Sequence, residues 1–88
     1  MAQILVTGAA GFIGAHAAAA LAQAGHRVVG CDSFNAYYPV ELKRARVEAL
    51  LQPAGVAVEP LDLCDGAALQ ALMRQHRIDT VLHLAAQA

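Results

Sequence analysis

Three glycines at intervals of three residues, Gly8, Gly11 and Gly14, separate an apolar run from an alanine-rich segment. The run over residues 3–7 contains β-branched and apolar residues, which is typical of a strand that is buried on both faces. The alanines that follow favour a helix over residues 12–24. A strand, a glycine turn and a helix in this order predict the first unit of a parallel α/β sheet.

Further apolar and helical segments alternate along the rest of the chain. Strands are expected at residues 27–31, 56–60 and 80–84, and helices at residues 40–51 and, from a cap at Asp65, up to residue 76. This β-α-β-α-β-α-β alternation predicts a Rossmann-like doubly wound parallel sheet, with helices on both faces and the strand order 3-2-1-4. A ligand is expected above the carboxyl ends of the first and fourth strands, where the strand order reverses.

Composition argues against several classes of protein. The net charge is −1, and the cations gather only at residues 43–46, so nothing points to nucleic acid or an anionic membrane. We interpret these cations as the solvated face of a helix, with a cofactor or substrate contact by Lys43 as the alternative. No apolar stretch approaches the ~20 residues that span a bilayer. Cys31 and Cys64 fit neither a disulfide framework nor a metal site, and we expect a cytoplasmic protein without metal.

Each glycine of the turn has an expected role in binding a dinucleotide. Gly8 would permit the tight turn, Gly11 would let the backbone approach a phosphate, and Gly14 would let the helix lie close to the sheet. The amides that begin the helix, Phe12 and Ile13 among them, would then point at the pyrophosphate, aided by the helix dipole. The glycine pattern alone fits a tight turn without a ligand equally well.

Asp32 supplies a second indication of dinucleotide binding. It follows the second strand and lies 18 residues after Gly14, near the roughly 20 residues expected for an acid that binds the adenosine ribose. Its carboxylate can accept hydrogen bonds from both ribose hydroxyls and would repel a 2′-phosphate. Since no arginine occupies residues 33–36, NAD is favoured over NADP. The alternatives are a solvated loop acid and a phosphate contact by Lys43, which would argue against NAD.

Four segments together resemble the extended short-chain dehydrogenase/reductase family, specifically its NAD-dependent sugar epimerases and dehydratases. They are residues 7–14, Asp32, the pair Asp62 and Leu63, and residues 83–88, in this order. Residues 32–46 further resemble the UDP-glucuronate 4-epimerase branch. The resemblance implies an NAD-dependent isomerase of nucleotide-sugar metabolism. It would oxidise a UDP-sugar at C4 and return the hydride to the opposite face of a keto intermediate.

The resemblance also implies which residues contact the cofactor. Asp62 and Leu63 would flank the adenine, and residues 84–86 would line the pyrophosphate and the nicotinamide ribose. From the sequence alone, Asp62 fits a helix cap equally well. The expected cofactor-binding residues are Gly8, Gly11, Phe12, Ile13, Gly14, Asp32, Ser33, Asn35, Lys43, Asp62, Leu63, Leu84, Ala85 and Ala86.

Members of this family use a Tyr-x-x-x-Lys pair with a Ser or Thr to move the substrate proton. The chain lacks this pair, because Glu41 follows Tyr37 by four residues and Leu42 follows Tyr38 by four. No histidine has an acidic partner that the sequence identifies, and His83 is interpreted as a packed strand residue. We therefore expect residues 1–88 to be the N-terminal part of an NAD-binding domain that is inactive without the catalytic and substrate-binding parts.

Three other interpretations stay open. A dehydratase or reductase of the same family would share every motif above. A non-catalytic dinucleotide sensor would keep the glycine turn, and an inactive fragment would bind nothing measurable. We further expect the complete enzyme to be a homodimer, and the outer edge of the fourth strand to favour self-association of the chain alone.

Overall fold

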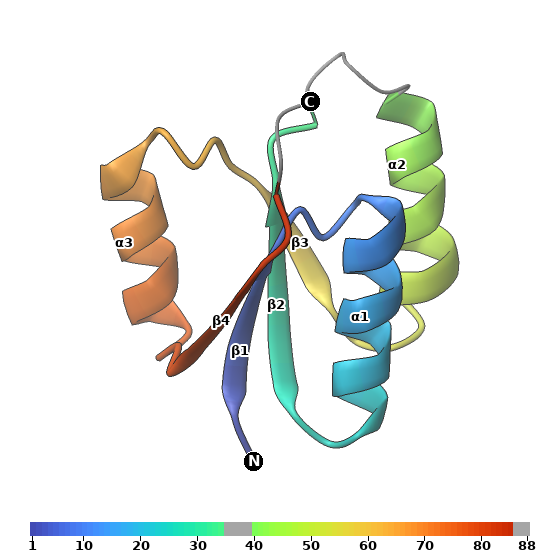
Figure 1. The fold of residues 1–88 in the computed structure, drawn as a ribbon, viewed down its shortest axis with the longest axis horizontal. Coiled ribbons are helices and arrows are strands. Elements are labelled where there is room, and N and C mark those ends of the chain that lie inside the picture. The colour runs from blue at the N-terminus through green and yellow to red at the C-terminus, as the bar shows by residue number, and fades with distance from the viewer. Residues whose placement is uncertain (35–39, 86–88) are drawn as a thin grey trace.

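In the computed structural model, which describes residues 1–34 and 40–85, four parallel strands form one sheet (Figure 1). The strands are β1 (Gln3–Thr7), β2 (Arg27–Asp32), β3 (Ala57–Pro60) and β4 (Thr80–His83). They lie in the order β3-β2-β1-β4, and every pairing is parallel. The predicted doubly wound α/β class and strand order are therefore confirmed, and every predicted strand ends within one residue of its expected bounds.

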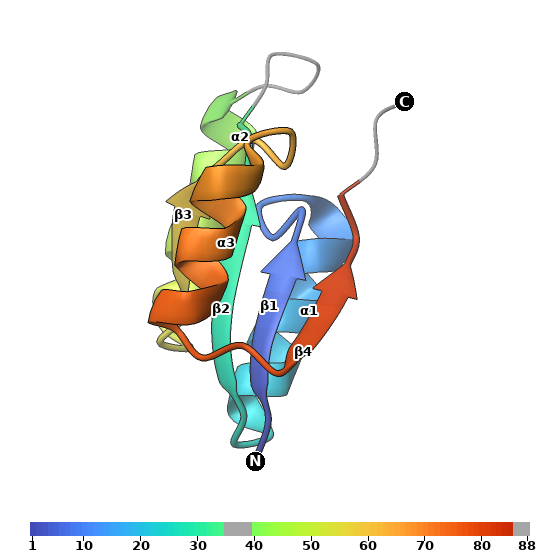
Figure 2. The same ribbon diagram turned by 90° about the vertical axis from the view of Figure 1, so that its left-hand side faces the viewer.

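The helices cover both faces of this sheet, as predicted. They are α1 (Phe12–Gln23), α2 (Val40–Arg46), the π-helical turn η1 (Val47–Leu51) and α3 (Gly66–Gln75). Figure 1 shows α1 and α2 on one face and α3 on the other, and Figure 2 shows the same arrangement with α3 toward the viewer. The single helix expected over residues 40–51 is thus divided, because its second half winds with the wider π-helical turn.

On one face of the sheet, alanines of α1 and of the turn before it pack against β1. Ala9, Ala15 and Ala18 are fully buried there, together with Ile4 and Val6 of β1. Alanine leaves room for the helix backbone to approach the strands closely. The helix that follows the glycine turn is therefore held near the sheet, which fixes the position of its first residues.

A second core lies between the sheet and α3. Leu5, Val29 and Cys31 of the central strands are buried against Leu72 of α3. Successive residues of β1 alternate between the two cores, as the pleat of a strand requires. The strand is therefore buried on both faces, which confirms the interpretation of its continuous apolar sequence.

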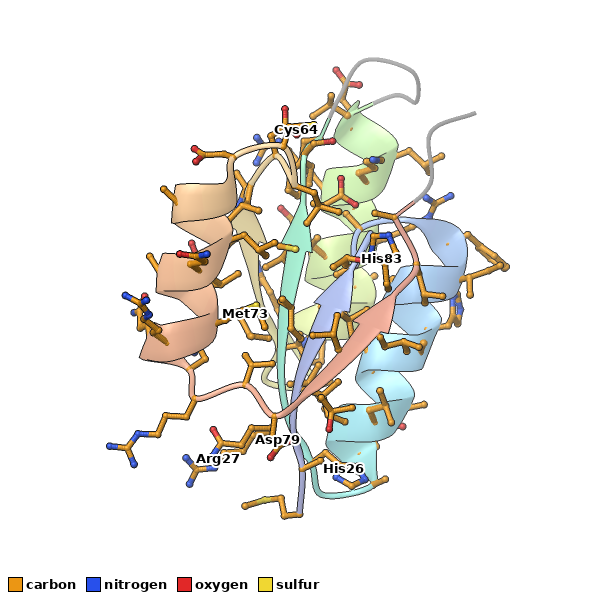
Figure 3. All side chains as sticks on the ribbon, turned by 60° about the vertical axis from the view of Figure 1, so that its left-hand side comes forward. His26, Arg27, Cys64, Met73, Asp79 and His83 are labelled. Carbon is orange, nitrogen blue, oxygen red and sulfur yellow. The ribbon has the colours of Figure 1, made fainter. Side chains whose placement is uncertain are left out.

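The register of the strands brings several polar residues to the carboxyl edge of the sheet. Thr7 of β1 is paired with Cys31 of β2 on one side and with His83 of β4 on the other. Asp32 is the last residue of β2. Figure 3 shows His83 near this edge, whereas Asp79 and His26 lie at the opposite edge. Within residues 1–34 and 40–85, no helix is both long and apolar enough to cross a membrane.

Candidate functional site

The turn between β1 and α1 is built around two glycines whose missing side chains are structurally required. Gly8 has a φ of +67°, and a Cβ there would lie 2.9 Å from the backbone nitrogen of Ala85. A Cβ on Gly14 would overlap the carbonyl oxygen of Gly8 and lie 2.8 Å from its carbonyl carbon. The turn therefore folds back on the first residues of α1 and lies against the segment after β4.

The start of α1 is open. Gly11 is the N-cap in extended conformation, and no side chain caps the helix. Its first turn contains no acidic residue, and Phe12 and Ile13 are 65% and 68% exposed. The first amides of a helix need partners and carry its positive partial charge. The first amides of α1 are therefore accessible to an anion, and a pyrophosphate contact by Phe12 and Ile13 stays a prediction.

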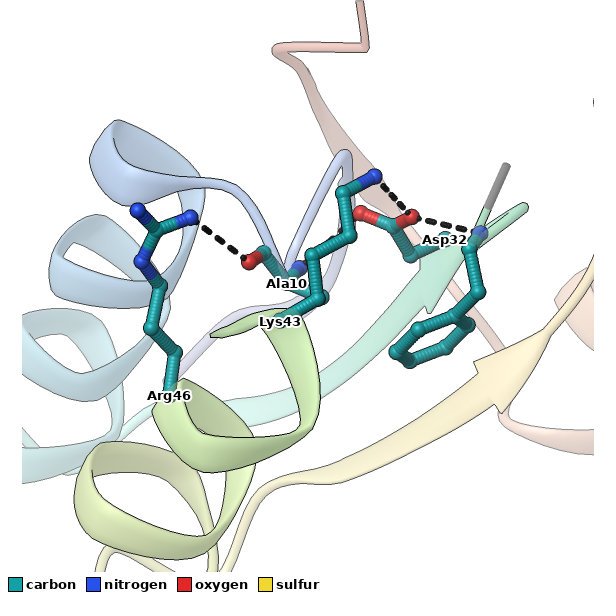
Figure 4. Close-up of polar contacts among 5 residues, drawn as sticks. Ala10, Asp32, Lys43 and Arg46 are labelled. Atoms are coloured by element: carbon teal, nitrogen blue, oxygen red, sulfur yellow. Dashed lines mark hydrogen bonds and ion pairs between the residues drawn. The ribbon is translucent and has the colours of Figure 1, made fainter. Parts of the chain in front are cut away.

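Asp32 is buried beside the turn and has three hydrogen-bond donors (Figure 4). Its Oδ1 accepts from the backbone N–H of Phe34 and from the ammonium of Lys43, each at 2.8 Å. Its Oδ2 accepts from the backbone N–H of Ala10 at 3.1 Å. The last of these bonds joins the acid directly to the glycine turn. The interpretation of Asp32 as a solvated loop acid is therefore wrong.

Lys43 was expected on a solvated helix face, and this expectation is wrong. The residue is 8% exposed, because the first turn of α2 lies over the carboxyl end of β2 and the ammonium pairs with Asp32. Its neighbour Arg44 is exposed, with its guanidinium 5.3 Å from the ring centroid of Phe34. Arg46 donates to the carbonyl oxygen of Ala10 at 3.4 Å. Each cation of α2 therefore has a different partner: a carboxylate, an aromatic ring and a backbone carbonyl.

Thr7 ties β1 to the segment after β4, a role that the sequence did not suggest. The residue is 2% exposed, and its Oγ1 accepts from the backbone N–H groups of Leu84 at 2.9 Å and Ala85 at 3.2 Å. A hydroxyl has two acceptor lone pairs and one donor. Because both lone pairs are used, the hydroxyl donates to Nδ1 of His83 at 2.7 Å.

The structure corrects the prediction for His83 and excludes one of the two alternatives for Asp62. His83 is exposed rather than packed, because β4 has a strand neighbour only on the β1 side within the described structure. Asp62 does not cap a helix; its Oδ1 accepts from the backbone N–H of Cys64 at 2.9 Å in a local turn. The cap of α3 is Asp65, as expected, and its Oδ1 accepts from the N–H of Ala68 at 3.1 Å.

The remaining predicted contacts are placed only in part. Leu63 is half-buried against the core under α3, and Leu84 packs against the core under α1. Ser33 is exposed next to Asp32. Asn35 and Ala86 lie outside the described residues, as do both tyrosines. In the described part of the chain, no cluster of three or more His, Cys, Asp or Glu side chains is placed to hold a metal ion.

Sequence reasoning also missed Gly30, in the middle of β2. A Cβ there would lie 2.5 Å from the Cβ of Ala9, so the glycine makes room for the turn to cross the strand. The backbone N–H of Ala9 donates to the carbonyl oxygen of Cys31 at 3.2 Å, which fastens the crossing. A glycine inside an otherwise apolar strand is the signal that indicates such a close approach.

Almost the whole sequence matches a known protein family. Residues 4–88 match the NAD dependent epimerase/dehydratase family. The chain belongs to this family. The resemblance predicted from the glycine turn, Asp32 and the segment after β4 is therefore confirmed, and the family's dependence on NAD agrees with the cofactor predicted from Gly8 and Asp32.

Relatives within the epimerase/dehydratase family are similar over almost the whole chain. UDP-glucuronate 4-epimerase 3 of Arabidopsis thaliana is 52% identical over 97% of this chain and 20% of the relative. A probable UDP-glucuronate 4-epimerase of Rhizobium meliloti is 43% identical over 96% of this chain and 25% of the relative. The chain thus spans about 20% of the length of the Arabidopsis relative and 25% of the Rhizobium one.

Solved structures of family members share the fold. UDP-glucuronic acid 4-epimerase from Bacillus cereus, in complex with NAD, is 38% identical with a TM-score of 0.80, over 97% of this chain and 27% of that one. UDP-glucose-4-epimerase from Stenotrophomonas maltophila, with bound NAD and formylated UDP-arabinopyranose, is 35% identical with a TM-score of 0.81, over 100% of this chain and 25% of that one.

Proposed function

We propose that this chain forms the NAD-binding part of a nucleotide-sugar 4-epimerase of the UDP-glucuronate 4-epimerase kind. The observation that carries the proposal is the hydrogen bond from the N–H of Ala10 to Oδ2 of Asp32. It joins a glycine turn, suited to a pyrophosphate, to a buried carboxylate, suited to a ribose, in one unit. A dinucleotide needs these two contacts at neighbouring places.

Each part of the cofactor has residues in this chain that would hold it. The pyrophosphate would lie at the open start of α1, against the amides of Phe12 and Ile13. The adenosine ribose would donate to Asp32, and Asp62 and Leu63 would flank the adenine. Leu84 and Ala85, whose amides Thr7 holds in place, would line the pyrophosphate and nicotinamide ribose. Bound NAD would accept a hydride from the sugar and return it.

The substrate and the reaction are proposed from the relatives. The Bacillus cereus enzyme is solved with UDP-glucuronic acid and NAD, and the Stenotrophomonas enzyme with a UDP-arabinopyranose derivative. We therefore infer a UDP-sugar whose C4 is oxidised and reduced again. The residues that move the proton would lie outside residues 1–88, and residues 1–88 alone would be inactive. A homodimer, a cytoplasmic location and self-association of the chain through β4 stay predictions.

A calorimetric titration of the full-length protein with NAD tests the cofactor site. Replacing Asp32 by Ala removes the ribose acceptor, and a lost hydrogen bond to a charged group weakens binding about 10- to 100-fold. Asp79→Ala is the matched control, because it removes the same charge at the opposite edge of the sheet. Equal NAD affinity in the Asp32 and Asp79 variants would contradict the ribose assignment.

A second experiment separates the epimerase from a dehydratase or reductase of the same family. The full-length protein is incubated with UDP-glucuronate, and the products are followed by proton NMR. An epimerase yields the C4 epimer with no net change in cofactor oxidation state. A dehydratase instead eliminates water, and a reductase consumes reduced cofactor, so either of these outcomes would replace the proposed reaction.

A further inference from the structure

The carboxylate of Asp32 is more heavily occupied than that of an acid that binds a ribose alone. A carboxylate offers about four acceptor positions on its two oxygens. Phe34 and Lys43 donate to Oδ1, and Ala10 donates to Oδ2. A single position on Oδ2 therefore remains for the ribose. Asp32 can accept from one ribose hydroxyl in this arrangement, and the other hydroxyl needs a different partner.

Lys43 also offsets the charge of Asp32. The two side chains are 10% and 4% exposed, and Nζ lies 2.8 Å from Oδ1. Charges so close and so well shielded from water interact strongly. A 2′-phosphate would consequently meet a neutral pair rather than a bare carboxylate. The electrostatic exclusion of NADP is therefore weaker than the sequence predicts from Asp32 alone.

We propose that Lys43 sets the choice between NAD and NADP. Its ammonium can bind a phosphate, and the ion pair with Asp32 prevents it from doing so. With Asp32 present, Lys43 neutralises the carboxylate and donates to the second ribose hydroxyl. Without the charge of Asp32, the ammonium is released at the same place and binds the 2′-phosphate of NADP. Lysine is well suited to this role, because its ammonium has three donors and interacts with phosphate as a point charge. This inference rests on the proposed NAD-binding function.

The other cations of α2 are less suited to this role. Arg44 is exposed and stacks its guanidinium over the ring of Phe34. Arg46 lies on the far side of the turn, where it donates to the carbonyl oxygen of Ala10. Only Lys43 among these three cations touches the carboxylate that would face the ribose. Arg44 is therefore a matched control, since it has the same charge at the next position of the same helix.

The test measures the affinities of the full-length protein for NAD and for NADP by calorimetry at one fixed salt concentration. Asp32→Ser is expected to raise the affinity for NADP at least about tenfold. Adding Lys43→Met to Asp32→Ser should abolish that gain, whereas adding Arg44→Met should preserve it. In the protein with Asp32 intact, Lys43→Met should lower NADP affinity more than NAD affinity, because the carboxylate is then unshielded.

Two results would overturn the inference: no gain in NADP affinity for Asp32→Ser, or the same gain with and without Lys43. Circular dichroism checks that Asp32→Ser is folded. If it is not folded, the inference is tested with Lys43→Met and Arg44→Met in the protein with Asp32 intact. Lys43→Met must then raise the preference for NAD over NADP at least about threefold, and Arg44→Met must leave it unchanged. Failure of the unmodified protein to bind NAD would instead refute the proposed function and this inference with it. Normal NAD binding without an effect of Lys43 would refute only the inference.

Discussion

Among the helices that start at the carboxyl edge of the sheet, α1 and α3 begin in opposite ways. The first amides of α3 are capped by its own sequence, because Asp65 accepts from the N–H of Ala68. The start of α1 has Gly11 as its N-cap and no capping side chain. Every helix start needs partners for its amides. The start of α3 is therefore closed by its own side chain, whereas the first amides of α1 stay accessible to an anion.

The glycines in the first turns of these helices differ in the same way. A Cβ on Gly14 of α1 would overlap the carbonyl oxygen of Gly8. A Cβ on Gly66 of α3 would have no atom within 4 Å. The glycine in α1 is therefore required by a close backbone approach, and the glycine in α3 is not. The presence of glycine alone does not mark the binding helix.

The largest expected effect comes from Gly14→Ala. Its Cβ overlaps backbone that cannot move without displacing the turn, so we expect a loss of about 3 kcal/mol or more in the free energy of unfolding. The melting temperature would fall by at least about 12 °C for a domain of this size. Gly66→Ala is the control, and thermal unfolding should show no loss for it. Similar melting temperatures for the two variants would show that α1 does not need its close approach.

Gly11→Asp tests whether the open start of α1 binds the pyrophosphate. The φ of −74° at this position suits any residue, although a Cβ would lie 3.2 Å from the carbonyl oxygen of Gly8, which must shift by a few tenths of an ångström. A carboxylate there would cap the amides that the ligand needs. Its charge would also repel the pyrophosphate. We expect NAD affinity to fall about 100-fold, while stability changes by less than about 1 kcal/mol.

Gly11→Asn is the matched variant, because it caps the helix without adding charge. Its NAD affinity should fall about tenfold, so the two variants together separate competition for the amides from charge repulsion. Calorimetric titration with NAD provides both numbers. Unaltered NAD binding by Gly11→Asp would place the pyrophosphate somewhere other than this helix start.

Asp65→Ala should have a smaller effect, confined to stability. Loss of an N-cap costs about 1 kcal/mol, and urea unfolding should show this loss. NAD affinity should not change, because α3 lies on the other face of the sheet from α1. Asp65→Asn retains a capping oxygen and should keep the stability within about 0.5 kcal/mol. A loss of NAD affinity in Asp65→Ala would mean that the two helix starts are coupled.

The smallest expected effect concerns the reactivity of Cys31 and reports on local opening of α3. Burial raises the pKa of the Cys31 thiol, and the neighbouring Asp32 raises it further. Cys64 is exposed in the loop before α3. Iodoacetamide should therefore label Cys64 quickly and Cys31 slowly, with mass spectrometry as the readout. Asp65→Ala should speed the labelling of Cys31 about fivefold, and equal labelling of both thiols in the native protein would refute the packing under α3.

The fold could be predicted from the sequence because its signals are local. Apolar runs such as residues 3–7 and their alternation with helical segments identify the strands, and the right-handed crossover rule then leaves few strand orders. Asp32 could be predicted as a site residue for a similar reason, since it directly follows a strand. Helix caps are also local, and Asp65 was found from its place before an apolar stripe.

The polar contacts that complete the site could not be predicted, because they join residues that are distant in the sequence. Lys43 looks like a surface lysine among other cations, and only the three-dimensional structure shows that it pairs with Asp32. Thr7 and His83 are 76 residues apart, and no local pattern indicates that they touch. The π-helical turn also lacks a local signal that separates it from an α-helix over residues 47–51.

The pairing of β1 with β4 also has a consequence for the order in which the chain can fold. Thr7 emerges from the ribosome 76 residues before His83, its hydrogen-bond partner. At about 5–20 residues per second, the central strand waits about 4–15 seconds for its second neighbour. During this interval one edge of β1 has unpaired backbone groups that other chains can bind. Among the four described strands, β1 is therefore synthesised first, yet its second edge is paired only after β4 has been made.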